Sequence, residues 1–139
     1  MKMLKARLID EAMRAREAAY CPYSGFAVGA ALLTKSGKVY LGANIENASY
    51  TPTVCAERVA FFKAVSEGER DFEAIAIAGA KRGEEPQGLF PPCGVCRQVM
   101  AEFCDGDFKV IIADGGEGTA LNLAEILPYG FGKDNLTDK

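Results

Sequence analysis

Three cysteines constrain this chain more than any other feature, because a fold that uses them together has to bring two distant segments side by side. Cys93 and Cys96 form a C-x-x-C pair, and Cys55 lies much earlier in the chain, two residues before Glu57. The chain contains no histidine. Three thiolates can bind a zinc ion and leave its fourth position open, and an open position is typical of a catalytic zinc site.

Each cysteine segment is predicted to lie at the start of a helix. A helix that begins at the double proline before Cys93 places both thiols of the C-x-x-C pair on one face of its first turn. Cys55 begins a second helix-like stretch, which runs to about Ser66. The positive end of each helix dipole favours a thiolate. Glu57 is then placed to reach a metal-bound water, which makes it a candidate proton carrier rather than a fourth ligand.

Other uses of these cysteines have to be weighed. A C-x-x-C pair alone is shared by redox dithiols and structural zinc knuckles. A closed structural site needs a fourth ligand, which here would be Cys21, Cys104 or a carboxylate, but both cysteines lie in contexts typical of small buried side chains. In a thioredoxin-like protein the pair directly follows a strand, whereas here it follows the polar segment 82–88.

Size and charge favour a small substrate. At 139 residues the chain is predicted to be one domain, residues 1–139. It has 16 basic and 19 acidic residues and no basic run, so it lacks the electrostatic footprint of a protein that binds nucleic-acid polymers. No apolar stretch is long enough to cross a membrane or to act as a signal core, and five cysteines suit reduced thiols. We therefore expect no membrane association and a cytoplasmic protein.

Hydrophobic periodicity predicts a three-layer α/β fold with a mixed sheet. The predicted helices are an amphipathic first helix from Leu4 to just before Pro22 and the segments 55–66 and 93–104, and the predicted strands are 26–34, 39–45, 74–80 and 108–113. The first two strands form a hairpin through a Ser-Gly turn, while the strand–helix–strand order that follows implies a parallel pair. The tail 119–128 has room for a short strand and a short helix. Ligands are expected at the carboxyl ends of the strands, beside the helix starts.

With these residues in hand, the chain resembles the small, homotetrameric, three-cysteine cytidine deaminases over nearly its whole length. The motifs that carry the resemblance are Pro-Tyr-Ser at 22–24, Phe-Ala-Val-Gly-Ala-Ala at 26–31, Asn-Ile-Glu-Asn-Ala-Ser-Tyr at 44–50, Cys-Ala-Glu-Arg at 55–58, Pro-Cys-Gly-Val-Cys-Arg-Gln at 92–98 and Leu-Pro-Tyr-Gly-Phe at 127–131. The resemblance implies a three-layer α/β/α sandwich with a mixed five-stranded sheet. The zinc deaminases share a Cys₃ ligand set and a glutamate that is not a ligand.

The resemblance implies a role for each residue of the metal centre. It makes Cys55, Cys93 and Cys96 the ligands of Zn²⁺ and Glu57 the proton shuttle. Three thiolates place more negative charge on the metal than a ligand set with histidine. The metal then lowers the pKa of its bound water less strongly. In this family the arginine equivalent to Arg58 hydrogen-bonds to ligand sulfurs, and it offsets part of that charge together with the two helix N-termini.

The resemblance also implies a nucleoside pocket that is completed by neighbouring chains. Its residues are Phe26, Asn44, Glu46, Ala48, Tyr50, Ala56 and Phe131. Asn44 and Glu46 correspond to a pair that hydrogen-bonds the ribose 3′-hydroxyl, and Ala48, Tyr50 and Phe131 reach sites of neighbours. From the residues alone, Phe26 could equally be a core side chain, and Asn44 and Glu46 an ordinary solvated turn. The match favours the binding roles.

The activity implied is the hydrolysis of cytidine and 2′-deoxycytidine to the uridine products and ammonia, as part of pyrimidine salvage. One alternative is a blasticidin-type or other small-molecule deaminase of the same superfamily. A second is a structural zinc module without activity, which leaves Glu57 and the ribose pair unexplained. The 55–66 helix is apolar almost all round, so it needs a second partner besides the sheet, which agrees with the implied homotetramer.

Overall fold

The computed structural model describes residues 2–137, and within them it forms one sheet of five strands. The strands are β1 (Phe26–Thr34), β2 (Val39–Ala43), β3 (Phe72–Lys81), β4 (Lys109–Ile112) and β5 (Thr119–Asn122). Their spatial order is β2-β1-β3-β4-β5. β3 and β4 are parallel, and every other neighbouring pair is antiparallel. The mixed five-stranded sheet predicted from the sequence is confirmed.

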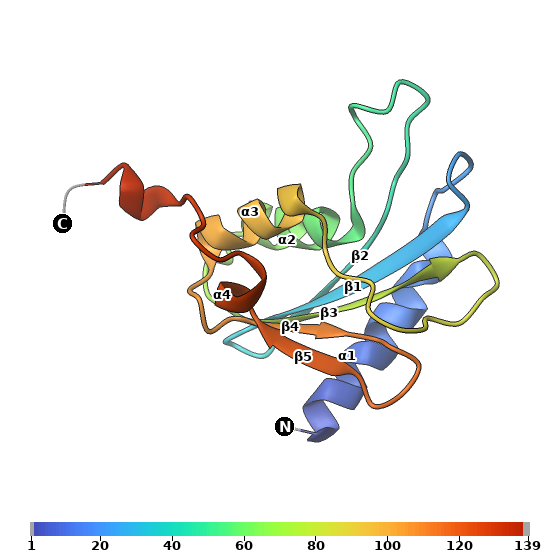
Figure 1. Ribbon diagram of the computed structural model, residues 1–139, viewed down its shortest axis with the longest axis horizontal. Helices are drawn as coiled ribbons and strands as arrows, with labels where there is room; N and C mark the ends of the chain where they lie inside the picture. Colours follow the sequence, from blue (N-terminus) through green and yellow to red (C-terminus); the bar gives the residue numbers. More distant parts are fainter. Residues whose placement is uncertain (1, 138–139) are drawn as a thin grey trace.

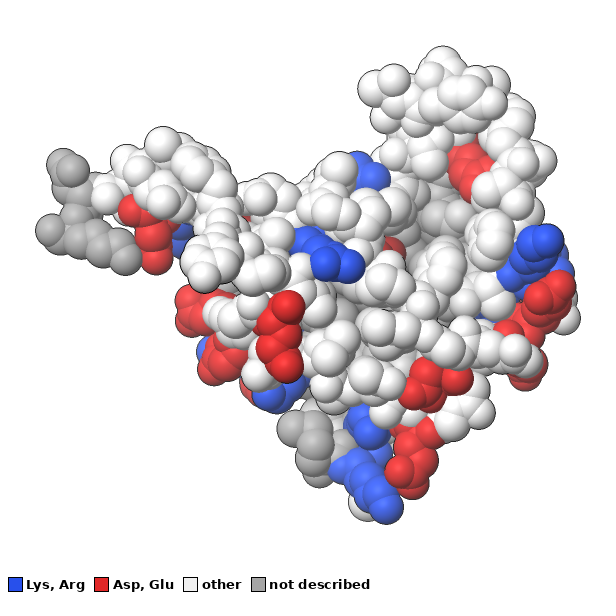
Figure 2. Space-filling view, viewed as in Figure 1, with Lys and Arg blue, Asp and Glu red and all other residues white. Residues whose placement is uncertain are grey.

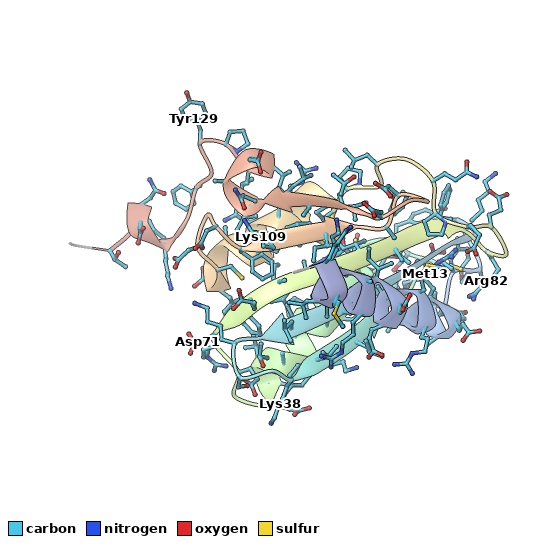
Figure 3. All side chains as sticks on the ribbon, turned by 90° about the horizontal axis from the view of Figure 1, so that it is seen from below. Met13, Lys38, Asp71, Arg82, Lys109 and Tyr129 are labelled. Carbon is cyan, nitrogen blue, oxygen red and sulfur yellow. The ribbon has the colours of Figure 1, made fainter. Side chains whose placement is uncertain are left out.

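Helices cover both faces of this sheet, as Figure 1 shows. The helices are α1 (Lys2–Ala15), α2 (Ala56–Ser66), α3 (Gly94–Phe103) and the short α4 (Leu123–Ile126), with 3₁₀ turns at Arg16–Ala18 and Lys133–Asn135. α1 lies across one face, which is the face seen in Figure 3, and α2 and α3 lie on the opposite face. The three-layer sandwich is therefore confirmed. The tail, whose form the sequence left open, contains β5 and α4.

The alternation of side chains along β1 divides the core into two layers. Ala31 and Leu33 point toward α1, whereas Ala30 and Leu32 point toward α2. Successive strand residues face opposite sides of a sheet, so a continuous apolar run such as 26–34 is what a strand covered on both faces requires.

Several predicted boundaries differ from the structure by a few residues, and three of them have an identifiable physical cause. α1 ends at Ala15 because Arg16 turns inward, where its buried guanidinium donates to the carbonyl oxygens of Ala27, Ala80, Lys81 and Glu84.

The strand predicted at 39–45 ends at Ala43 because the Asn44 side chain takes over the pairing with β1. α3 begins at Gly94 rather than at the prolines. Pro91 precedes a proline and is therefore disfavoured in a helix, and Cys93 is itself extended, with φ −69° and ψ 167°, as the N-cap.

Two segments project from the sandwich. The loop of residues 46–53 rises between β2 and α2, and the C-terminal tail, residues 128–137, extends away from the body (Figure 1). Their aromatic side chains are uncovered, with Tyr50 74% exposed and Phe131 58% exposed. Tyr129 points outward in Figure 3. Within residues 2–137 no helix is long and apolar enough to cross a membrane.

Candidate metal centre and substrate pocket

The predicted site residues gather at one edge of the sheet because of the strand directions. β2 and β3 both run antiparallel to β1, so the edge at which β2 and β3 end is the edge at which β1 begins. Phe26 opens β1 there, and Asn44 directly follows β2. The connections from β2 to α2 and from β3 to α3 leave from the same edge and carry Cys55 and Cys93.

A glycine in β2 sets the start of α2. A Cβ built on Gly42 would lie 2.3 Å from the Ala56 carbonyl oxygen and 2.6 Å from the Ala60 nitrogen, so the absence of a side chain lets the first turn of α2 lie directly on the strand. Cys55 is the extended N-cap residue of α2, with φ −72° and ψ 155°. The third predicted thiol is therefore held at a helix start by backbone packing.

The three predicted thiols come together. The Cys55 and Cys93 sulfurs are 3.6 Å apart, those of Cys93 and Cys96 are 3.5 Å apart, and all three lie within 4.8 Å of one another. Zinc–sulfur bonds of about 2.3 Å in a tetrahedron separate sulfurs by about 3.8 Å, whereas a disulfide needs about 2 Å. The cluster therefore has the spacing of zinc ligands.

The pKa values of the three-thiol cluster are also compatible with the binding of a divalent cation. The hydrogen bond from the Cys96 thiol lowers the pKa of Cys55 to about 5, and the Arg58 guanidinium adds to this effect. The same contact raises the pKa of Cys96 far above its ordinary value. Thiols this close share their protons unequally, and a divalent cation replaces the protons when it binds.

Glu57 and Arg58 flank the cluster from the first turn of α2. Arg58 donates from Nη2 to the Cys55 sulfur at 3.5 Å. Glu57 is 4% exposed, and its Oε1 has no hydrogen-bond partner among residues 2–137. Burial raises the pKa of Glu57 to about 7. A buried, unpartnered carboxyl group that can both take and release a proton near neutral pH is suited to acid–base work.

Hydrogen bonds within the chain hold both side chains of the predicted ribose pair. Asn44 accepts at Oδ1 from the Val28 backbone N–H and donates from Nδ2 to the Phe26 carbonyl, each at 2.9 Å. Glu46 accepts at Oε1 from the backbone N–H groups of Tyr23 and Ser24, each at 3.0 Å.

The Ser24 hydroxyl donates to the other carboxylate oxygen of Glu46 and lowers the pKa of that group. Both predicted ribose-binding side chains are thus fixed in place, and Glu46 is kept ionised.

A cavity of about 320 Å³ lies beside Glu46, and Figure 2 shows the surface hollowed beneath the projecting loop. It is lined by Tyr23, Ser24, Glu46, Asn47, Tyr50 and Thr53. Phe26 is 37% exposed at the same edge of the sheet.

The remaining predicted pocket residues are divided between the core and the projecting segments. Ala56 is fully buried beside Cys55, whereas Ala48 and Tyr50 are exposed on the loop of residues 46–53. Phe131 is exposed on the C-terminal tail, where its carbonyl oxygen accepts a hydrogen bond from Gln98 at 2.7 Å. The single chain leaves these exposed side chains without a cover.

Sequence reasoning missed two residues that support the zinc-binding segment. Arg97 donates to the Pro92 carbonyl at 2.8 Å and to the Ile126 carbonyl at 2.6 Å, so it ties the segment before Cys93 to α4. Arg97 could have been identified from the sequence because it directly follows Cys96. Phe90 stacks on Phe26, and no sequence pattern marked it.

Comparisons with known proteins agree with this geometry. The family described as cytidine and deoxycytidylate deaminase zinc-binding region matches residues 3–113. A cytidine deaminase of Halalkalibacterium halodurans is 53% identical over 138 residues, which cover 98% of this chain and 100% of that protein. A crystal structure of cytidine deaminase from Burkholderia pseudomallei has a TM-score of 0.83 and 44% identity, covering 91% of this chain and 98% of that chain. A blasticidin-S deaminase of Bacillus cereus is 32% identical over 107 residues, covering 75% of this chain and 76% of that protein.

Proposed function

This chain belongs to the cytidine and deoxycytidylate deaminase family, and from that membership we propose which of its residues carry out the reaction. It is a zinc-dependent enzyme that hydrolyses cytidine to uridine with release of ammonia. We extend the activity to 2′-deoxycytidine and to a role in pyrimidine salvage in the cytoplasm. The observation that carries the residue assignment is the cluster of three thiols with the buried, unpartnered Glu57 beside it.

Cys55, Cys93 and Cys96 are the side chains that would hold the zinc ion, and Arg58 would neutralise part of the charge of their thiolates. Zinc bound there supplies the Lewis acidity that makes water a nucleophile near neutral pH.

Glu57 moves the protons. It accepts one proton from the attacking water and delivers it to N3 of the base, which makes C4 a better electrophile. It then takes the second proton from the hydroxyl group now on C4 and delivers it to the amino group. The C4–N bond breaks as the C4 carbonyl forms, so that cytidine and water become uridine and ammonia. The Glu57 pKa of about 7 supports both uptake and release of a proton, because the carboxyl group is close to half-protonated at neutral pH.

Asn44 and Glu46 would hold the ribose, and Phe26 would line the base side of the pocket. A carboxylate has about four lone-pair positions, so Glu46 can accept a ribose hydroxyl in addition to the bonds it already accepts. The cavity beside Glu46 has a carboxylate and no Lys or Arg among its described lining residues. This favours free nucleosides over 5′-phosphorylated ones. On the face drawn in Figure 2, basic side chains are scattered among acidic ones, which supports a small substrate rather than a nucleic-acid polymer.

The uncovered aromatic residues support a homotetramer in which neighbours complete each site. Phe62 of α2 is 49% exposed, and Tyr50 and Phe131 project on separate segments. We assign Ala48 and Tyr50 to the ribose 5′ side of one neighbour's substrate and Phe131 to the base of another's. Burying these side chains between chains removes apolar surface that a single chain exposes.

Ammonia release measured side by side with metal content tests this proposal. The purified protein is offered cytidine, 2′-deoxycytidine, cytidine 5′-monophosphate, adenosine and blasticidin S. We expect one zinc per chain bound through three sulfurs and rapid turnover of the first two substrates. Faster turnover of blasticidin S than of cytidine would assign the chain to the alternative deaminase activity. Comparable rates on cytidine and its monophosphate would refute the proposed nucleoside preference, and X-ray absorption that finds four sulfurs would refute the open zinc site.

A further inference from the structure

A stacked pair of phenylalanines links the substrate side of the site to the zinc-binding segment. The ring centroids of Phe26 and Phe90 are 6.1 Å apart, with 18° between the ring planes. Phe26 opens β1, whereas Phe90 lies in the connection between β3 and α3, three residues before Cys93. Phe90 is half-buried, whereas the Phe26 ring is more exposed. Any movement of the Phe90 ring therefore acts on both segments.

The Phe90 ring has a defined seat on the sheet. A Cβ built on Gly79 would lie 2.3 Å from Cε1 and 2.4 Å from Cδ1 of Phe90, so the ring occupies the space that any side chain there would fill. Gly79 pairs with Val28 of β1, whose side chain packs with the core layer beneath α2 and α3. The seat thus lies on the face of the sheet that also carries Phe26. A glycine in a strand often marks such a close approach.

The backbone of Phe26 is already fixed on both sides. Its N–H donates to the Ser24 hydroxyl at 3.0 Å, and its carbonyl accepts from Asn44 at 2.9 Å. These bonds hold the main chain and leave the ring free to rotate about χ1 and χ2. Within residues 2–137 the aromatic partner of this ring is Phe90.

We propose that Phe90 is a positioning residue: seated over Gly79, its ring holds the Phe26 ring toward the nucleoside and fixes the approach of Cys93 to the metal. The inference rests on the proposed function for the nucleoside part only. The seating of the ring and its effect on the metal-binding segment are separate from the identity of the substrate.

Three variants test the seat: Phe90→Ala, Gly79→Ala and the double variant. Phe90→Ala should raise KM for cytidine by about two- to tenfold, the worth of an aromatic pair, while kcat changes less. It should also shorten the half-life of zinc release to a chelator. Gly79→Ala should produce the same two effects, because the added methyl group displaces the ring. The double variant should be no worse than Phe90→Ala alone, since the methyl group then enters vacant space.

Phe90→Leu separates the two roles and covers the case in which Phe90→Ala does not fold. Leucine fills the seat over Gly79 without stacking, so zinc release should stay close to that of the unchanged protein while KM rises. Phe103→Ala is the matched control. It removes another half-buried phenylalanine, stacked on Phe61 at 6.2 Å, from the far end of α3. It should lower the melting temperature and leave KM unchanged.

Two results would overturn the proposal. The first is a Phe90→Ala protein that loses stability as Phe103→Ala does, with KM and zinc release unchanged. The second is a double variant in which the two effects add in full, because the ring and the added methyl group would then not compete for one space. If the unchanged protein does not deaminate cytidine, the proposed function fails. Zinc release across the same variants still tests whether the ring is seated over Gly79.

Discussion

The metal centre and the projecting segments are built in opposite ways. Cys55, Cys93 and Cys96 lie at the starts of two helices that pack on the sheet, and Glu57 is almost fully buried. The loop of residues 46–53 and the tail of residues 128–137 extend away from the sandwich with their aromatic side chains uncovered (Figure 1). One chain therefore assembles the groups that would perform the chemistry, but it leaves the groups that would enclose a substrate facing outward.

This contrast indicates that the groups that carry out the reaction and the groups that cover the substrate have different structural requirements. Groups that move protons and hold a metal need positions fixed to within a fraction of an ångström, which a packed helix start provides. Groups that cover a substrate can come from another chain, provided that the interface orders them. Variants in the metal centre should therefore act on turnover without changing assembly, and variants in the projecting segments should change both.

The largest effect is expected from Glu57→Gln. Glutamine has nearly the same size and keeps the fold and the zinc, but it cannot carry a proton. Acid–base catalysis by one group is worth about 10²–10⁴-fold, and here the same group serves several transfers, so kcat should fall by at least that factor. The rate of ammonia release measures this effect. Zinc content and light scattering are the controls for metal binding and assembly. A variant that keeps near-normal turnover would exclude Glu57 as the proton carrier.

The second-largest effect is expected from Arg58→Ala. It removes the guanidinium that donates to the Cys55 sulfur and leaves the charge of the thiolates unbalanced. Partners of metal ligands are worth about 10- to 100-fold in activity or metal affinity, so activity should fall by that amount while the melting temperature changes little. Arg70→Ala is the control, because Arg70 is exposed and binds only the carbonyl groups of Val65 and Glu69 among the described residues. Equal activity of the two variants would show that charge balance is not the role of Arg58.

Phe131→Asp tests the enclosure side of the comparison. A charge on the tail should weaken assembly and remove an aromatic wall, so activity should fall by about tenfold and in step with dissociation. Leu136→Asp is the matched control, since Leu136 is exposed on the same tail and has no proposed contact with substrate. Light scattering and activity are measured over a dilution series. A fully active monomer would reject both the tetramer and the shared site.

The core of this fold could be predicted from the sequence because its signals are local. β1 was predicted with its observed limits, since an apolar run ended by a Ser-Gly turn defines a strand without reference to the rest of the chain. The cysteine spacing likewise predicted two helix starts. Such patterns report on neighbours within a few residues.

What escaped prediction depends on contacts between distant segments. Arg16 ends α1 early only because carbonyl groups of β1 and β3 surround its guanidinium. The position of the Phe90 ring depends on Gly79, eleven residues earlier, which has no side chain and leaves space for the ring. A buried arginine and a strand glycine each satisfy a partner that no local pattern reveals.

The smallest effect is expected from Ser24→Ala, at the boundary between the two regions. The Ser24 hydroxyl donates to Glu46 and holds the pKa of that carboxyl below its ordinary value. A carboxyl whose pKa is lowered by folding adds stability above its unfolded pKa and loses it as the pH falls through the folded pKa. The variant should therefore raise the pKa of Glu46, as measured by NMR titration, and cost less than about 1 kcal/mol of unfolding free energy near pH 7, because solvent screens a carboxylate at the surface. The difference should shrink in acid. Ser66→Ala, which loses a hydroxyl bonded to a backbone carbonyl, should show no such pH dependence. If both variants behave alike, Ser24 does not hold the charge of Glu46 in place, and the ribose side of the site is less rigid than its hydrogen bonds indicate.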